Sequence, residues 1–123
     1  METAVDEDVI ELIVEGIQEK KGKEIVSIDI SALENSVCRY FIICHGESNT
    51  QVSAIAQWVE RIMEEKHSEK VWHKEGFENA QWVLLDYVDV VVHIFQKEFR
   101  DFYNLESLWA DGKIEKYKNK YFN

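Results

Sequence analysis

The stretch QWVLLDYVDVVVHIF, residues 81–95, constrains the fold more than any other part of the sequence. It contains two runs of aliphatic and β-branched residues, which is the composition of buried β-strands. Asp86 and Asp89 separate the runs, with only two residues between them. Two strands joined so closely predict an antiparallel hairpin. Because a lone hairpin is marginally stable in water, the rest of the chain must supply more strands and a covering layer.

The predicted pairing sorts the hairpin side chains into two faces. With Tyr87 and Val88 at the tip, one face carries only aliphatic pairs and is the expected core face. The other face is mixed, and its predicted pairs are Trp82 with His93, Leu84 with Val91, and Asp86 with Asp89. Val88 fits this tip poorly, because tight hairpins favour Gly or Asn where φ is positive.

The mixed face has two interpretations on pattern alone. An aromatic anchor with acids around it would suit a recognition patch for a basic partner. Alternatively, the face is a half-exposed sheet edge or lies under a helix, and Asp86 and Asp89 are there only for turn chemistry. Both interpretations stay open at this point.

The remaining chain supplies helices and further strands. Helical spacing of apolar residues predicts helices over about 6–20, 50–66 and 98–109, the last broken near Asn104. Apolar runs predict strands in 24–30, with Ser27 on its open face, in 37–44 and in 70–73. The order α-β-β-α-β-β-β-α indicates an α/β (α+β) fold with a mixed five-stranded sheet flanked by helices. We expect one domain over residues 1–112 and a lysine-rich C-terminal tail over 113–123.

The net charge of the chain limits the classes of binding partner that we expect. With 24 acidic residues against 14 Lys and Arg, the formal net charge is −10. Direct binding to nucleic acid or to an anionic membrane is not expected, since both need cationic residues on phosphates. A basic protein surface would attract this chain, although acidity also serves solubility alone. The acidic N-terminus resembles no secretory or organelle presequence, so we expect a cytoplasmic protein with reduced cysteines.

The sequence offers little for catalysis. The four histidines and two cysteines lack the spacing of a metal motif, so we expect no metal and no cofactor. Cys38 and Cys44 lie on one predicted strand, about 20 Å apart, and cannot form a disulfide. Ser48 with Gln51 has the spacing of a capping box at a helix start. The alternative is a nucleotide-binding or nucleotidyltransferase-like enzyme that uses Ser48, Asp86 and Asp89.

Three stretches together resemble the ribosomal silencing factor family (RsfS, or Iojap-like). They are RYFIICHGESNTQVSAIA (39–56), EGFENAQWVLLDYVDVVVHIF (75–95) and FRDFYNLESLW (99–109). The family usually has Gly at the hairpin tip, where this chain has Val88, and often Asp or Asn at the position of Arg39. The lysine-rich tail lies outside the shared pattern.

The resemblance implies both a fold and a function. The fold would be a reduced nucleotidyltransferase without catalytic acids, and the protein would not be an enzyme. It would bind large-subunit ribosomal protein fourteen, block the joining of ribosomal subunits and repress translation under nutrient limitation. Free family members are commonly homodimers. The matching binding face would be centred on Trp82, and the predicted partner-binding residues are Trp82, Leu84, Asp86, Tyr87, Asp89, Val91 and His93.

Overall fold

A computed structural model of the protein describes residues 2–118, with side chains from Glu7 onward. The elements in chain order are α1 (Glu2–Glu19), β1 (Lys23–Asp29), β2 (Tyr40–Gly46), α2 (Asn49–His67), β3 (His73–Glu75), β4 (Trp82–Asp86), β5 (Val90–Gln96), α3 (Lys97–Tyr103), α4 (Leu105–Leu108) and β6 (Lys113–Tyr117). The α/β (α+β) class expected from the sequence is confirmed, and the sheet has one strand more than expected.

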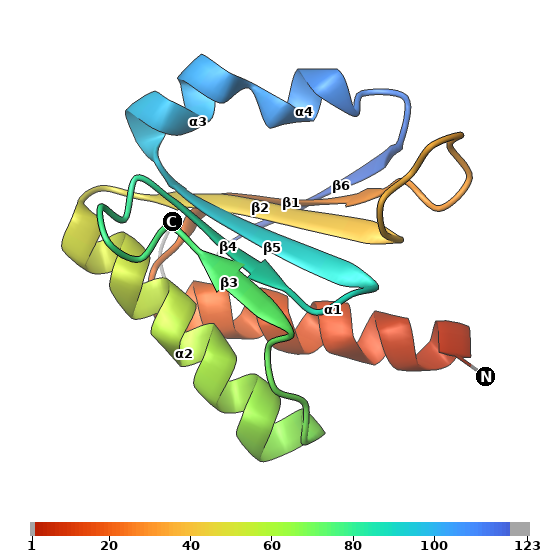
Figure 1. Ribbon diagram of the computed structural model, residues 1–123, viewed down its shortest axis with the longest axis horizontal. Helices are drawn as coiled ribbons and strands as arrows, with labels where there is room; N and C mark the ends of the chain where they lie inside the picture. Colours follow the sequence, from red (N-terminus) through yellow and green to blue (C-terminus); the bar gives the residue numbers. More distant parts are fainter. Residues whose placement is uncertain (1, 119–123) are drawn as a thin grey trace.

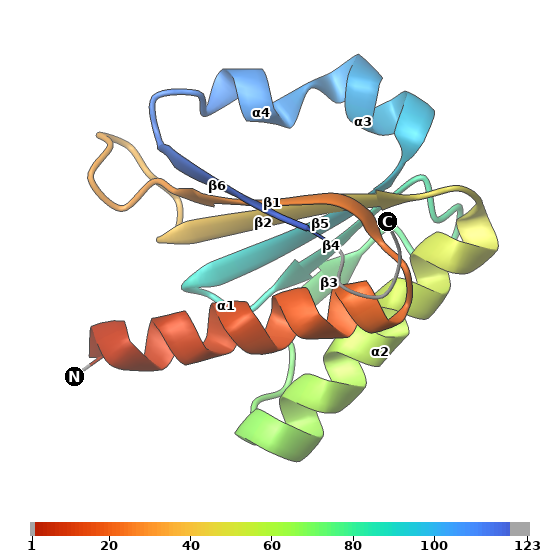
Figure 2. The ribbon, with the colours of Figure 1, turned by 180° about the vertical axis from the view of Figure 1, so that it is seen from behind.

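The sheet is mixed, with strand order β3-β4-β5-β2-β1-β6. Strands β2 and β5 pair in parallel at its centre, while the hairpin and both edges pair antiparallel. Helices α1 and α2 cover one face, and α3 and α4 span the other (Figures 1 and 2). The sheet is therefore the middle of three layers, with a separate apolar core on each side.

The two cores differ in how they are covered. The first lies between the sheet and α1–α2 and takes the apolar stripes of both helices, including Ile13, Ile17, Ile55 and Met63. The second lies beneath α3–α4 and is smaller; its buried members are Val26, Ile28, Ile30, Phe41, Ile43, Val91 and Phe95. Half-buried side chains complete this second core, among them Trp82, Leu84 and Trp109. The mixed face of the hairpin thus lies on the α3–α4 side.

The sixth strand corrects the prediction for the C-terminal residues. Lys113–Tyr117, expected within a frayed or extended tail, pairs antiparallel with β1 at the sheet edge. Ser27 is consequently only 6% exposed, and its hydroxyl lies 3.0 Å from that of Tyr117. This strand has no apolar pattern that would predict it, because most of its residues are charged, as is usual for an edge strand. Residues 119–123 of the predicted tail lie outside the described residues.

Two other strands are displaced from their predicted positions. The strand expected at 70–73 begins instead at His73. The residue before it, Trp72, donates its N–H to the carbonyl of Asp86 at 2.9 Å. Its three residues are all exposed, so they carry no apolar pattern. The strand expected at 37–44 begins at Tyr40, because the chain before it forms an irregular loop.

The Ser48 cap and the break at Asn104 are confirmed, whereas α1 begins at Glu2, earlier than the predicted residue 6. The hydroxyl of Ser48 accepts the N–H of Gln51 at 3.1 Å and starts α2. Asn104 adopts a left-handed conformation with φ 48°, which separates α3 from α4 as expected. Asn tolerates this conformation better than most residues. The break allows α3 and α4 to span the sheet in two short segments.

Candidate partner-binding site

The hairpin pairs in a register two residues away from the predicted one. Trp82 is opposite Phe95, Leu84 is opposite His93, and Asp86 is opposite Val91. The predicted pairing was therefore wrong, because the tip is Val88 and Asp89 rather than Tyr87 and Val88. A shift of two residues keeps every side chain on its predicted face, since strand side chains alternate with period two. The division into an aliphatic face and a mixed face is confirmed.

The tip itself is strained at Val88. The N–H of Asp89 donates to the carbonyl of Tyr87 at 2.9 Å, which closes a three-residue turn around Val88. Val88 has φ 77°, a value typical of the rare γ-turn and unfavourable for a β-branched residue. Asp86 stabilises the turn, because its Oδ1 accepts the N–H of Val88 at 2.7 Å. The acid at this position thus serves turn chemistry.

The structure distributes the seven predicted partner-binding residues over three environments. Trp82, Leu84 and Asp86 are half-buried, and Asp89 is exposed at the tip. Val91 and His93 are buried beneath α3–α4, while Tyr87 is buried on the opposite side of the sheet. Only the first four therefore present surface to a partner.

Trp82 connects the buried core to the surface. Its Nε1–H donates to Nδ1 of His93 at 3.1 Å, so the polar edge of the indole points inward. Its ring stacks on Phe95 at 4.9 Å and contacts the Tyr103 ring at 4.8 Å between centroids. Burial lowers the pKa of His93 to about 3, and its Nε2 has no partner within the described residues. His93 is therefore neutral and fixes the orientation of Trp82.

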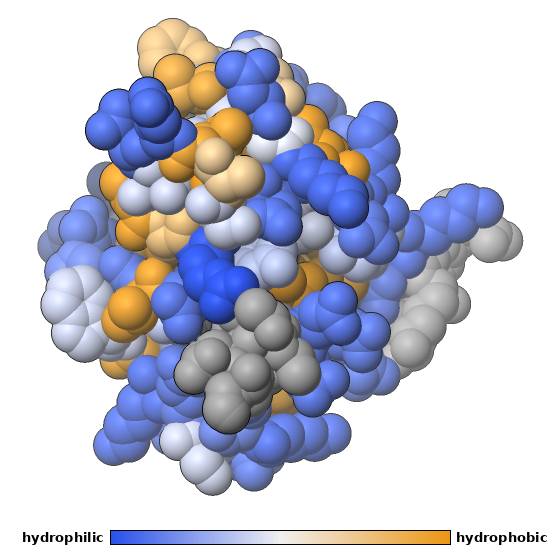
Figure 3. Space-filling model, turned by 90° about the vertical axis from the view of Figure 1, so that its right-hand side faces the viewer, coloured by the Kyte–Doolittle hydropathy of each residue, from blue (hydrophilic) through white to orange (hydrophobic). Residues whose placement is uncertain are grey.

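Two aromatic residues of α3 extend this surface and were missed by the sequence analysis. Phe102 is 77% exposed and Tyr103 is 50% exposed, and their rings lie 5.0 Å apart. With Trp82 they form a continuous row of three rings, here called the aromatic surface. Spacing alone did not reveal them: Phe102 and Tyr103 follow Phe99 by three and four residues, which on a regular helix predicts the same face as Phe99, packed against the second core. Figure 3 shows hydrophobic residues among hydrophilic ones at the top of the molecule, over the α3–α4 layer.

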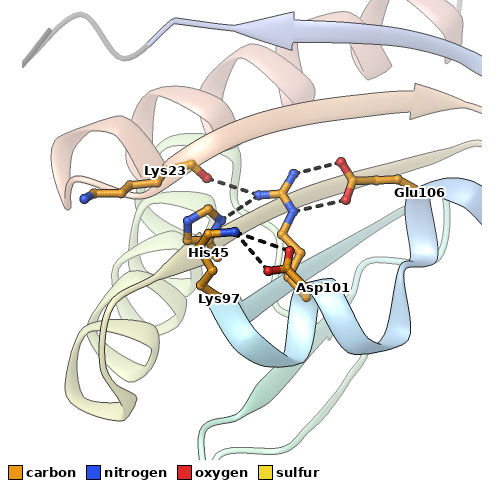
Figure 4. A network of polar contacts seen from close by, with 6 residues as sticks. Lys23, His45, Lys97, Asp101 and Glu106 are labelled. Carbon is orange, nitrogen blue, oxygen red and sulfur yellow. Dashed lines mark hydrogen bonds and ion pairs between the residues drawn. The ribbon is translucent and has the colours of Figure 1, made fainter.

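Arg100 anchors the aromatic surface to the sheet (Figure 4). This side chain is 5% exposed, and its Nε and Nη2 donate to the two carboxylate oxygens of Glu106 at 3.1 and 2.9 Å. Its Nη1 donates to Nδ1 of His45 at 2.9 Å and to the carbonyl of Lys23 at 3.3 Å. One guanidinium thus joins α3, α4, β1 and β2.

The protonation of His45 follows from this contact. Because Nδ1 accepts from Arg100, the ring proton lies on Nε2 and the imidazole is neutral. Burial and then the positive charge of Arg100 lower the pKa of His45. A neutral His45 therefore keeps α3 attached to the sheet, and the ion pair with Glu106 satisfies the buried charge.

The residues of the enzyme alternative are not brought together. The backbone carbonyl of Asp89 accepts the N–H of Tyr40, where β2 begins, whereas Ser48 follows Gly46, where β2 ends. Six residues of strand separate these ends by about 20 Å. Within the described part of the chain, no group of three or more His, Cys, Asp or Glu could hold a metal ion. Burial also raises the pKa of Cys44 to about 12, so its thiol is no nucleophile.

Comparison with known protein families assigns the chain to one of them. The family model described as "Ribosomal silencing factor during starvation" matches residues 3–121. The chain belongs to the ribosomal silencing factor family. This match includes the C-terminal segment, which the sequence analysis placed outside the shared pattern. Among the residues that the structure describes, no helix is long and apolar enough to cross a membrane.

Individual RsfS relatives agree with this assignment. The ribosomal silencing factor RsfS of Halalkalibacterium halodurans is 39% identical over 107 residues, covering 87% of this chain and 90% of the relative. That of Bacillus subtilis is also 39% identical, covering 86% and 88%. A crystal structure of a Chromobacterium violaceum protein has a TM-score of 0.80 at 36% identity and covers 85% of each chain. The resemblance found in the sequence is thereby confirmed.

Proposed function

We propose that this protein is a non-catalytic ribosomal silencing factor that represses translation by steric exclusion. It binds the large ribosomal subunit through ribosomal protein fourteen and so blocks joining of the small subunit. The names of its relatives support the silencing role, and the family description supports its use during starvation. The observation that carries the proposal is the aromatic surface of Trp82, Phe102 and Tyr103.

The aromatic surface has the properties of a protein-docking site. Tyr, Trp and Phe are enriched at interfaces and dominate their binding energy. Phe102 has no covering layer within the described residues, yet its contact with Tyr103 and the Arg100 network below hold the surface in place. A preorganised surface binds with a smaller entropic loss than a mobile one.

The charge of the protein supports a basic protein as the partner. A net charge of −10 opposes contact with ribosomal RNA but favours approach to a cationic ribosomal protein. In this proposal Trp82, Leu84, Asp86 and Asp89 contact the partner. Tyr87, Val91 and His93 act from inside, because they are buried and can only support the hairpin.

Co-sedimentation with purified large subunits tests the proposal. Trp82→Ala should weaken binding at least about thirtyfold, since truncation of an interface anchor costs about 2 kcal/mol or more. Phe102→Ala should weaken binding at least about fivefold, a loss of about 1 kcal/mol. Because Phe102 is 77% exposed, this second variant leaves the fold intact.

Trp58→Ala provides the matched control. Trp58 is half-exposed on α2, which covers the opposite face of the sheet (Figure 1), and its indole N–H donates to Glu19 at 2.7 Å. Its loss should leave binding to large subunits unchanged. If Trp82→Ala and Phe102→Ala sediment like the parent protein, the docking site is elsewhere. If the parent protein does not bind large subunits at all, the proposed function is refuted.

The free state and location of the protein complete the proposal. The free protein is a homodimer in the cytoplasm, as the family resemblance implies. Sedimentation equilibrium at micromolar concentration measures its mass directly. A monomer under these conditions would contradict the dimer, without bearing on ribosome binding.

A further inference from the structure

A cleft lies next to the aromatic surface, between α3 and the connection from β3 to β4. Its volume is about 210 Å³, and it is lined by Gly76, Glu78, Asn79, Gln81, Trp82 and Tyr103. Pockets for whole small molecules usually start near 300 Å³. The cleft is therefore of a size for one long side chain of a bound partner.

The walls of the cleft are fixed before anything binds. Gly76 has φ 91°, and a Cβ there would collide with the carbonyl oxygen of Trp82, so the connection lies directly against β4. The N–H of Ala80 donates to the carbonyl of Gly76 at 2.9 Å, and Nε2 of Gln96 donates to the carbonyl of Ala80 at 3.1 Å. These contacts fix the loop at both ends. A preformed cleft loses little entropy when it is filled.

The chemistry of the cleft selects a cation. Two aromatic rings line the cleft, those of Trp82 and Tyr103, with centroids 4.8 Å apart. Glu78 adds a carboxylate, and Asn79 and Gln81 add amide oxygens. None of the lining residues is cationic. Aromatic faces with one carboxylate attract a positive group and repel an anion.

Of the basic side chains, arginine fits this set best. Its planar guanidinium stacks on aromatic faces and donates two parallel hydrogen bonds to a carboxylate, whereas the lysine ammonium is a compact point charge. We propose that the cleft receives an arginine side chain of the docked partner, stacked against Trp82 and Tyr103 and paired with Glu78. The inference rests on the proposed function for the identity of the partner, but the cleft itself is testable without ribosomes.

The direct test is an NMR titration of the protein with N-acetyl-arginine amide. The indole Nε1–H signal of Trp82, identified by its absence in Trp82→Phe, should shift and saturate at millimolar probe. The uncharged analogue N-acetyl-citrulline amide should leave the signal in place. Glu78→Gln should raise the dissociation constant of the arginine probe by up to about fivefold, the upper end for an exposed ion pair. Glu64→Gln removes the same charge on exposed α2 and should change nothing.

Each result of the titration decides the inference. Equal shifts with arginine and citrulline, or no shift with either, would overturn it. Equal effects of Glu78→Gln and Glu64→Gln would also overturn it, since only the overall charge would then matter. These outcomes are independent of ribosome binding, so the failure of the cleft and the failure of the proposed function are distinguishable.

Binding to large subunits then tests the role of the cleft in docking. Tyr103→Leu and Glu78→Gln should each weaken binding, by about fivefold for the lost ring. If one guanidinium contacts both residues, the double variant should be weakened by less than the product of the two single effects. Independent, multiplying effects would show that no shared side chain occupies the cleft.

Discussion

The buried His93 should make the protein sensitive to mild acid. Burial lowers its pKa from 6.5 to about 3, so the unfolded chain binds a proton in the range where the folded chain does not. The contribution of neutral His93 to the free energy of unfolding is therefore fully present above pH 6.5 and decreases as the pH falls below it. A pH of 5 lies about 1.5 units below the unfolded-state pKa of 6.5. Protonation of the unfolded chain therefore lowers the free energy of unfolding by about 2 kcal/mol, at about 1.36 kcal/mol per unit.

Urea unfolding followed by circular dichroism at pH 7, 6 and 5 measures this loss. The comparison is with His93→Asn, whose amide oxygen can still accept the N–H of Trp82 but does not titrate. Other groups, including His45 and the carboxylates, titrate in both proteins and cancel in the difference. Between pH 7 and pH 5 the parent protein should lose about 2 kcal/mol more than the variant. Parallel pH curves would refute a neutral, buried His93.

Two further predictions concern the residues that support the proposed docking surface. Val88→Gly should raise the free energy of unfolding by about 1 kcal/mol, because the strain of φ 77° at a β-branched residue outweighs the flexibility of glycine. Urea unfolding should then show a higher midpoint at an unchanged slope. An unchanged midpoint would argue against strain at Val88. Arg100→Leu should cost about 3 kcal/mol, because it leaves Glu106 unpaired and frees α3–α4 from the sheet. Hydrogen exchange should then accelerate in α3–α4 but not in α1–α2, and equal acceleration in both layers would contradict this role.

The sequence predicted those features of the fold that depend on local chemistry or on periodicity. The Ser48 cap, the break at Asn104 and the two faces of the hairpin all follow from single residues or from alternation. Periodicity does not fix register, however. The pairing depends on the turn, and Val88 adopts a conformation that its side chain disfavours.

The proposed docking surface was only half predictable for a different reason. Trp82 was found because the hairpin pattern isolates it, but no local pattern shows how the helices that follow the hairpin, α3 and α4, turn back over its mixed face. Which hairpin residues are exposed depends on where α3–α4 lies over the sheet, and that in turn depends on Arg100 reaching His45 and Lys23. Such tertiary contacts leave no periodic signal. The same limit hid β6, whose charged residues are ordered by pairing with β1.

The position of β6 has a consequence for the synthesis of the protein. Ser27 in β1 and Tyr117 in β6 are 90 residues apart, so β1 is made long before its outer neighbour. At about 5–20 residues per second, the ribosome needs about 5–20 seconds to make the intervening chain. During that interval the outer edge of β1 has unpaired N–H and C=O groups, which are a template for pairing with other chains. A nascent chain of this silencing factor is thus most prone to aggregate while it is still attached to the ribosome that makes it.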